Sequence, residues 1–219
     1  MLEGVTTVLL DVDGTLIDSF PGIRAGFLHA LNQVGWPAPS EERISRIAGP
    51  PMEETMASLG MDQPTVDRAF NAYMDYTRSG GWAEAKAYPG VKELLEQWCA
   101  DGFRLITATS KGEGFARAIL EREEMLDLFE FIGAAEEYGT RRGKKQVIQY
   151  VKDNVNLEGE PVLMVGDRSH DIEGAAAFGV DTCAVTWGYG TADEWARAKY
   201  IAKTTEELDQ IIRKFHAAH

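Results

Sequence analysis

Two closely spaced aspartates, Asp11 and Asp13, come directly after the apolar segment 5–10. Two carboxylates this close repel each other unless a cation or a proton lies between them. Mg²⁺ prefers oxygen ligands and is the natural partner for such a pair. Gly14 lets the chain turn sharply after the segment, and Thr15 can donate a hydrogen bond. Taken alone, the motif could also be an acidic turn that only caps a helix.

A second acidic motif, with Asp167 and Asp171, follows another apolar segment, 161–165. Asp167 could complete a metal site with Asp11, and Asp171 could position Asp167 or a metal-bound water. Asp171 could also be a simple helix cap, because an alanine-rich helical stretch follows it. The two roles of Asp171 are compatible, so this motif predicts further oxygen ligands for the cation.

Hydroxyl and lysine side chains at two other places could hold a phosphoryl group. Thr109 and Ser110 end the apolar segment 104–109, where a hydroxyl could donate to a phosphoryl oxygen. Lys144 and Lys145 open a predicted helix, and a lysine there could neutralise phosphate charge. Taken alone, Thr109 and Ser110 would indicate only a helix cap, and Lys144 and Lys145 only a solvated pair of lysines.

The elements that must position these residues alternate along the chain. Short apolar runs bounded by turn residues predict buried strands, at residues 5–10, 104–109, 129–133, 161–165 and 182–186. Apolar residues at helical spacing predict helices near 91–98, 147–155 and 208–215, the last opened by Thr204 and Glu207 as a capping box. This alternation predicts an α/β fold, a Rossmann-like parallel sheet with ligands beyond the carboxyl ends of its strands.

The stretch from about residue 20 to 80 breaks the alternation, because it shows helical stripes and no convincing strand. One stripe comprises Ile23, Phe27, Leu31 and Val34, and another comprises Val66, Phe70, Tyr73 and Met74, with Pro64 in a first turn. An all-helical block after the first strand predicts a cap on the sheet. We therefore expect a core domain of residues 1–18 and 86–219 and a helical cap domain of residues 19–85.

Composition limits the classes of partner. A net charge of −13 argues against a nucleic acid polymer or a membrane, and no obligate protein partner is evident. A small phosphorylated substrate remains compatible, since a metal ion and lysines reverse the potential locally. No apolar run approaches the roughly 20 residues that span a bilayer, and Met1–Gly4 lack a signal-peptide pattern. Cys99 and Cys183 indicate reduced thiols, so we expect a cytoplasmic protein.

Taken together, the motifs resemble those of the haloacid dehalogenase superfamily, and most of all its phosphoglycolate-phosphatase-like branch with a helical cap. The family pattern is Asp-x-Asp-Gly-Thr, then a strand-end Thr or Ser, then a Lys, then Gly-Asp-x-x-x-Asp. All four motifs occur here in that order, between Asp11 and Asp171. The segments Tyr88–Val91 and Gly188–Gly190 are also similar to that branch.

The resemblance implies a Mg²⁺-dependent phosphatase that hydrolyses a small phosphomonoester through an aspartyl-phosphate. Asp11 matches the nucleophile and Asp13 the general acid and base. Thr109 and Lys144 match the residues that hold the phosphoryl group, with Lys145 as the fallback for the lysine. The matched substrate-contacting positions also include Gly14, Thr15 and Ser110, and the matched metal positions are Asp11, Asp13, Asp167 and Asp171.

The sequence leaves the substrate and two alternative functions open. Phosphoglycolate, a nucleoside monophosphate and a sugar phosphate all suit the motifs, and the cap residue Arg46 is a candidate contact for a second anionic group. A sugar phosphomutase of the same fold would use the same residues but return the phosphoryl group to its substrate. A non-catalytic protein that binds a phosphate ligand is the alternative of another class.

Overall fold

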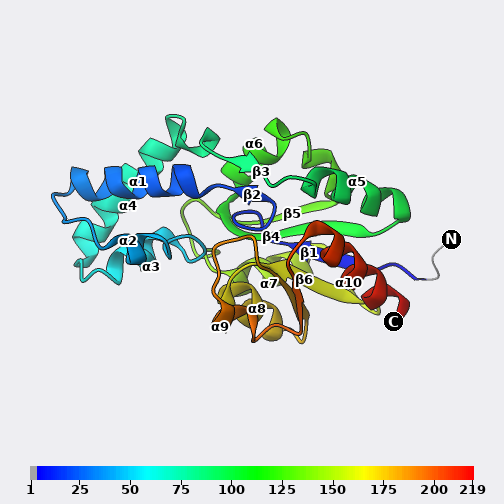
Figure 1. Ribbon diagram of the computed structural model, residues 1–219. Helices are drawn as coiled ribbons and strands as arrows, with labels where there is room; N and C mark the ends of the chain where they lie inside the picture. The colour runs from blue at the N-terminus through cyan, green and yellow to red at the C-terminus, as the bar shows by residue number, and fades with distance from the viewer. Residues whose placement is uncertain (1–3) are drawn as a thin grey trace.

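The computed structural model describes residues 4–219, and its centre is a six-stranded parallel sheet (Figure 1). The strand order is β5-β4-β1-β6-β7-β8. The strands are β1 (Thr7–Leu10), β4 (Arg104–Gly112), β5 (Phe131–Ala135), β6 (Val162–Gly166), β7 (Asp181–Val185) and β8 (Tyr200–Ala202). The predicted α/β class with a Rossmann-like parallel sheet is confirmed.

Helices cover both faces of this sheet, which explains why its central strand is buried throughout. All four residues of β1 are buried, and successive side chains of a strand point to opposite faces. Val8 and Leu10 pack in an apolar cluster with α5 (Val91–Asp101), α6 (Glu113–Arg122) and α10 (Thr205–Ala217). Leu9 packs on the other face with α7 (Lys144–Asn154) and α8 (Ser169–Ala176).

The order of the strands creates a crevice at the carboxyl end of β1. The chain runs from β1 to β4 and β5 on one side, then returns to β6 on the other side. Leu10 is in register with Thr107 of β4 and with Val165 of β6. Residues that follow these three strands therefore meet at one place, which is where open α/β sheets bind ligands.

A helical group is inserted between two short strands, β2 (Ile17–Asp18) and β3 (Lys86–Ala87), which pair antiparallel. It comprises α1 (Phe20–Gln33), α2 (Glu41–Ile44), α3 (Met52–Ala57), α4 (Gln63–Arg78) and the 3₁₀ helix η1 (Gly81–Ala83). The group has an apolar cluster of its own, which includes Phe27 and Met56. Figure 1 shows α1–α4 at one end of the molecule and α10 at the other.

The proposed domain limits, 1–18 with 86–219 and 19–85, agree with the positions of β2 and β3 but stay a prediction, and residues 1–3 lie outside the described part. Pro64 lies in the first turn of α4, as predicted. Thr204 caps α10 by accepting from the Glu207 N–H at 3.2 Å, but the predicted capping box is incomplete, because the Glu207 carboxylate accepts from the Lys203 N–H at 2.8 Å and not from the Thr204 N–H. The strand predicted at 129–133 runs from Phe131 to Ala135 instead. No helix within residues 4–219 is both long and apolar enough to cross a membrane.

Five short elements were not predicted from the sequence. They are η2 (Leu126–Leu128), α9 (Ala192–Trp195), the edge strand β8 and the linker strands β2 and β3. The short strands lack a sustained apolar pattern, since β8 contributes one buried and one exposed residue among its three. Length and pattern alone could not distinguish such segments from loops.

Candidate active site

Asp11 lies at the carboxyl end of β1, and its surroundings fix one of its two carboxylate oxygens. Its backbone N–H donates to the Val165 carbonyl at 2.9 Å, which continues the pairing of β1 with β6. Its Oδ1 accepts from the Val12 N–H at 2.8 Å and lies 2.8 Å from Lys144 Nζ. Its Oδ2 accepts no hydrogen bond from residues 4–219. One oxygen is thus held in place while the other is free to react.

Lys144 begins α7 and is only 5% exposed. Its ammonium lies 2.7 Å from Asp171 Oδ1 and donates to the Ala108 carbonyl at 2.6 Å, in addition to its contact with Asp11. Burial disfavours the charged form, but Asp11 and Asp171 outweigh that cost and raise the pKa of Lys144 above its usual value. Lys145 is exposed, so geometry favours Lys144 for the predicted lysine position.

Asp167 lies in the loop after β6 and Asp171 in the first turn of α8, each 1% exposed. Asp171 Oδ2 accepts from the N–H groups of Asp167 and Arg168, both at 3.0 Å. Asp167 Oδ2 accepts from the Tyr189 N–H at 2.6 Å, whereas Asp167 Oδ1 is buried without a hydrogen-bond partner among the described residues. A buried, unpaired carboxylate oxygen is costly unless a bound ligand satisfies it.

These residues form a cluster whose charge fits a divalent cation. Asp11, Asp167 and Asp171 can each offer an oxygen within 4.8 Å of the others. Three carboxylates with the one ammonium of Lys144 leave a net charge of −2. Burial, with the charges of Asp171 and Asp11, raises the pKa of Asp167 well above its usual value. Burial also raises the pKa of Asp11 to about 6, although Lys144 lowers it. Mg²⁺ would neutralise this charge with the oxygen ligands it prefers.

Gly14 allows the loop after β1 to approach Asp167 closely. It adopts a φ of +81°, and a Cβ there would lie 2.4 Å from Asp167 Oδ2. No other residue fits this position without displacing the carboxylate. Thr15 is buried, its hydroxyl has no hydrogen-bond partner among the described residues, and it does not line the cleft described next.

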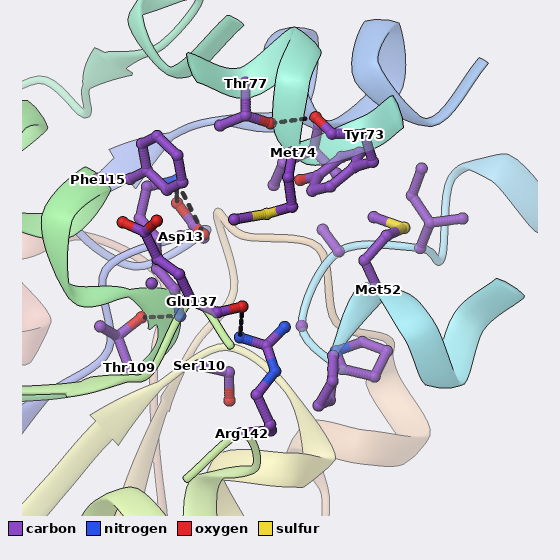
Figure 2. Close-up of a pocket in the computed structure, with 18 of the residues that line it drawn as sticks. Asp13, Met52, Tyr73, Met74, Thr77, Thr109, Ser110, Phe115, Glu137 and Arg142 are labelled. Atoms are coloured by element: carbon purple, nitrogen blue, oxygen red, sulfur yellow. Dashed lines mark hydrogen bonds and ion pairs between the residues drawn. The ribbon is translucent and has the colours of Figure 1, made fainter. Parts of the chain in front are cut away.

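A cleft opens beside the cluster, between the strand ends and the helical group (Figure 2). The cleft has a volume of about 80 Å³, or about 700 Å³ when its solvent-open mouth is included. The predicted residues Asp11, Asp13, Thr109 and Ser110 all line it. The opposite wall comes from α3, α4 and the loop between α2 and α3. Such a narrow cleft suits a small ligand.

Arg46, predicted as a substrate contact, lies outside this cleft. Its side chain is 61% exposed and pairs with Glu42 at 3.1 Å. The residues that line the cleft do not include it, although its neighbours Ile47 and Ala48 do. The sequence pattern located the right loop but could not show which of its side chains point inward.

Two charged residues in the cleft were given no role from the sequence. Lys111, two positions after Thr109, donates to Asp13 Oδ1 at 3.0 Å and Oδ2 at 3.3 Å. Arg142 forms a two-pronged ion pair with Glu53 of α3, at 2.6 and 2.8 Å. The position of Lys111, two residues after Thr109, could have identified it from the sequence. Nothing in the sequence links Arg142 to Glu53, which lies 89 positions away.

Arg168 links the Asp167 loop to the helical group. Its guanidinium donates to the Ala48 carbonyl and pairs with Glu194 at 3.1 Å. Burial opposes the charge of Glu194, but Arg168 and the Ser169 N–H lower the pKa of Glu194 to about 2. The loop that carries Asp167 therefore touches both the sheet and the segment before α3.

The fold and these motifs define a class of enzyme. The family model of the haloacid dehalogenase-like hydrolases matches residues 8–185, and the chain belongs to this family. The family resemblance predicted from the motifs is confirmed, and phosphoglycolate phosphatases are among the matching relatives. The predicted enzyme class, a phosphoric monoester hydrolase of this family, is likewise supported by the relatives.

Three similar proteins illustrate the family. The chain is 41% identical to the tyrosine-protein kinase PtkA of Mycobacterium tuberculosis, over 87% of its own length and 65% of that protein. It is 36% identical to the 5'-nucleotidase of Pseudomonas aeruginosa, over 85% of each chain. The crystal structure of a predicted phosphatase from Clostridium acetobutylicum superposes with a TM-score of 0.91 at 31% identity, over 97% of this chain and 100% of that one. The chain thus spans less than two thirds of PtkA.

Proposed function

We propose that the protein is a Mg²⁺-dependent phosphatase that hydrolyses a small phosphomonoester through an aspartyl-phosphate at Asp11. The observation that carries this proposal is the buried cluster of three carboxylates and one lysine, with a net charge of −2, at the edge of a narrow cleft. The similarity to a 5'-nucleotidase and to a predicted phosphatase supports it.

Asp11 and Asp167 are the proposed side-chain ligands of Mg²⁺, together with the backbone carbonyl of Asp13. Asp171 is placed to orient them, because its two oxygens already contact Lys144 and the N–H groups of Asp167 and Arg168. When bound, Mg²⁺ would reduce the repulsion between the Asp11 carboxylate and the phosphoryl oxygens.

The chemical step follows from the free oxygen of Asp11. Its Oδ2 attacks phosphorus, the bond from phosphorus to the leaving oxygen breaks, and Asp13 gives that oxygen a proton. Asp13 then removes a proton from water, which attacks phosphorus and releases inorganic phosphate and Asp11. The Thr109 and Ser110 hydroxyls are placed to donate to phosphoryl oxygens, and Lys144 favours the ionised form of Asp11.

Residues 19–85 are proposed to act as a cap domain over the core domain of residues 1–18 and 86–219. The chain passes between the two domains at β2 and at β3. Within the described residues, the antiparallel pairing of these two strands is the only strand pairing there. The cap supplies the wall of the cleft that faces Asp11. Its closure would limit water entry and select a small phosphorylated substrate, without a nucleic acid or membrane partner.

A second candidate is phosphoryl transfer to an acceptor other than water. The similarity to a protein named tyrosine-protein kinase favours it, and an aspartyl-phosphate can pass its phosphoryl group to a hydroxyl. The chain contains no Gly-x-x-x-x-Gly-Lys-Ser/Thr nucleotide loop, so any such transfer would start from Asp11.

A sugar phosphomutase would also depend on Asp11 but would release no inorganic phosphate.

The test is phosphate release from a panel of small phosphomonoesters, with and without Mg²⁺, with Asp11→Asn as the blank. We expect release that requires Mg²⁺ and is lost in the variant. Asp193→Asn, an exposed acid on α9, is the matched control and should behave like the unmodified protein. Release from Asp11→Asn at an unchanged rate would exclude the covalent route. Phosphorylated Asp11 without released phosphate would favour transfer to another acceptor.

A further inference from the structure

The part of the cleft that faces a leaving group is apolar. Met52 on α3 and Tyr73 and Met74 on α4 line the cap side, and Phe115 of α6 lies across from them (Figure 2). Phe70 of α4 also lines the cleft. Sulfur and aromatic side chains of this kind bind flat apolar groups well. A leaving group attached to a phosphoryl group at Asp11 would therefore meet this surface first.

The two cations that line the cleft are already compensated by carboxylates. The Lys111 ammonium is bound to both oxygens of Asp13. The Arg142 guanidinium binds Glu53 through Nε and Nη2, and its Nη1 donates to the carbonyls of Glu136 and Glu137. A guanidinium has five N–H donors, so these bonds use four of them. Each cation thus already has a carboxylate partner, so neither offers uncompensated positive charge to a carboxylate on the leaving group.

The remaining charge in the cleft is acidic. Glu137 lines it, and its carboxylate pairs with Arg78 at 3.7 Å. The charged lining residues are three acids, Asp11, Asp13 and Glu137, and two bases, Lys111 and Arg142, which leaves a net charge of −1. A carboxylate on the substrate would thus enter a narrow cleft that offers no uncompensated positive charge beyond the phosphoryl site.

We infer that the enzyme acts on phosphomonoesters whose leaving group is uncharged and presents an aromatic face, and that it discriminates against leaving groups with a carboxylate. This inference rests on the proposed phosphatase function. It narrows the substrate class set by the motifs, because it disfavours phosphoglycolate and favours neutral aromatic alcohols.

Benzyl phosphate and 4-carboxybenzyl phosphate form a matched pair, since they share the same type of alcohol and differ in one charge. We expect kcat/KM for benzyl phosphate to exceed that for the carboxylated ester by about tenfold or more. The kcat/KM for phosphoglycolate should be low, like that for the carboxylated ester. Equal values, or a preference for either carboxylated substrate, would overturn the inference even though phosphate release would still support the phosphatase.

Glu53→Gln tests the electrostatic explanation, because it removes the carboxylate that neutralises Arg142. The preference for benzyl phosphate should shrink by about threefold or more as the guanidinium becomes free to pair with the substrate. Glu54→Gln is the matched control, since Glu54 is exposed on the same helix and does not line the cleft. An unchanged preference in Glu53→Gln, or an equal change in both variants, would contradict this explanation.

Binding separates this inference from catalysis. Calorimetric titration of Asp11→Asn with each ester in Mg²⁺ should give a dissociation constant about tenfold or more lower for benzyl phosphate. This result would support the inference even if the unmodified protein released no phosphate. Equal affinities, or no detectable binding of benzyl phosphate, would overturn it.

Discussion

The two walls of the cleft differ in polarity, since one is charged and the other is mainly apolar. The core wall presents Asp11, and Asp167, Asp171 and Lys144 lie beside it outside the cleft lining. All four are at most 5% exposed and are linked by short ion pairs and hydrogen bonds. The cap wall carries methionine and aromatic side chains that make few polar contacts. Rigid strand ends suit a reaction that needs fixed charges, whereas apolar helix faces suit the selection of a leaving group. Changes to the first wall should affect every substrate, and changes to the second should affect only some.

The largest effect should come from Lys144, whose ammonium pairs with Asp11 and Asp171 in the carboxylate cluster. Lys144→Met leaves three carboxylates without their ammonium, so kcat/KM should fall about a thousandfold for all substrates. The free energy of unfolding should fall by about 3–5 kcal/mol, because breaking a buried ion pair leaves uncompensated charge. Kinetics and urea unfolding would measure both. Lys145→Met, at the exposed neighbouring position, should change neither quantity, and similar behaviour of the two variants would contradict the comparison.

Asp167→Asn should weaken metal binding about 10- to 100-fold, since it removes a proposed ligand and one of the negative charges. The Mg²⁺ concentration for half-maximal activity should rise accordingly. Added Mg²⁺ should raise the melting temperature of the unmodified protein, because a ligand that binds only the folded state stabilises it. That increase should be much smaller in Asp167→Asn and intact in Asp193→Asn. An unchanged thermal response in Asp167→Asn would remove Asp167 from the metal site.

On the cap wall, Phe70→Leu keeps an apolar side chain but removes the aromatic face. We expect kcat/KM for benzyl phosphate to fall about tenfold, with phosphoglycolate changed by less than about threefold. This selective effect is the counterpart of the uniform loss in Lys144→Met. A uniform loss in Phe70→Leu would mean that the cap contributes to the chemical step itself.

The smallest effect should come from Glu194, which pairs with Arg168, the residue next to the proposed metal ligand Asp167. Its pKa in the folded protein is about 2, below the ordinary value of 4.5. Its stabilising contribution is therefore complete above about pH 4.5 and is lost as the pH falls toward 2. Because the pair is partly solvated, we expect Glu194→Gln to cost about 1 kcal/mol at pH 7 and almost nothing near pH 2. Urea unfolding without metal at both pH values would show whether the difference disappears.

The sequence predicted the core wall better than the cap wall, for a physical reason. Asp11 and Asp167 each follow a buried strand and Thr109 lies near the end of β4, and parallel strands bring their carboxyl ends to one edge. The cap wall depends on which side of each helix faces the core, and this is a tertiary property. We therefore predicted Arg46 as a substrate contact, although its side chain lies outside the cleft. We assigned no role to Arg142, whose partner Glu53 lies far along the chain.

Within the predicted stripe of α4, Phe70, Tyr73 and Met74 were correctly placed on one helix face. The stripe alone indicated packing and could not show that this face also lines a cleft. The difference arises because an apolar side chain serves packing and binding equally well, whereas a buried carboxylate cluster has few uses besides holding a cation.

The central claim, that Asp11 carries the phosphoryl group during turnover, can be tested by mass spectrometry. The protein would be mixed with Mg²⁺ and its best substrate, quenched in acid within the first turnovers, and digested. The account predicts a mass increase of one phosphoryl group on the peptide that contains Asp11, absent when Mg²⁺ is omitted. Full turnover with no phosphorylated Asp11 at any quench time, and undiminished turnover by Asp11→Asn, would contradict it.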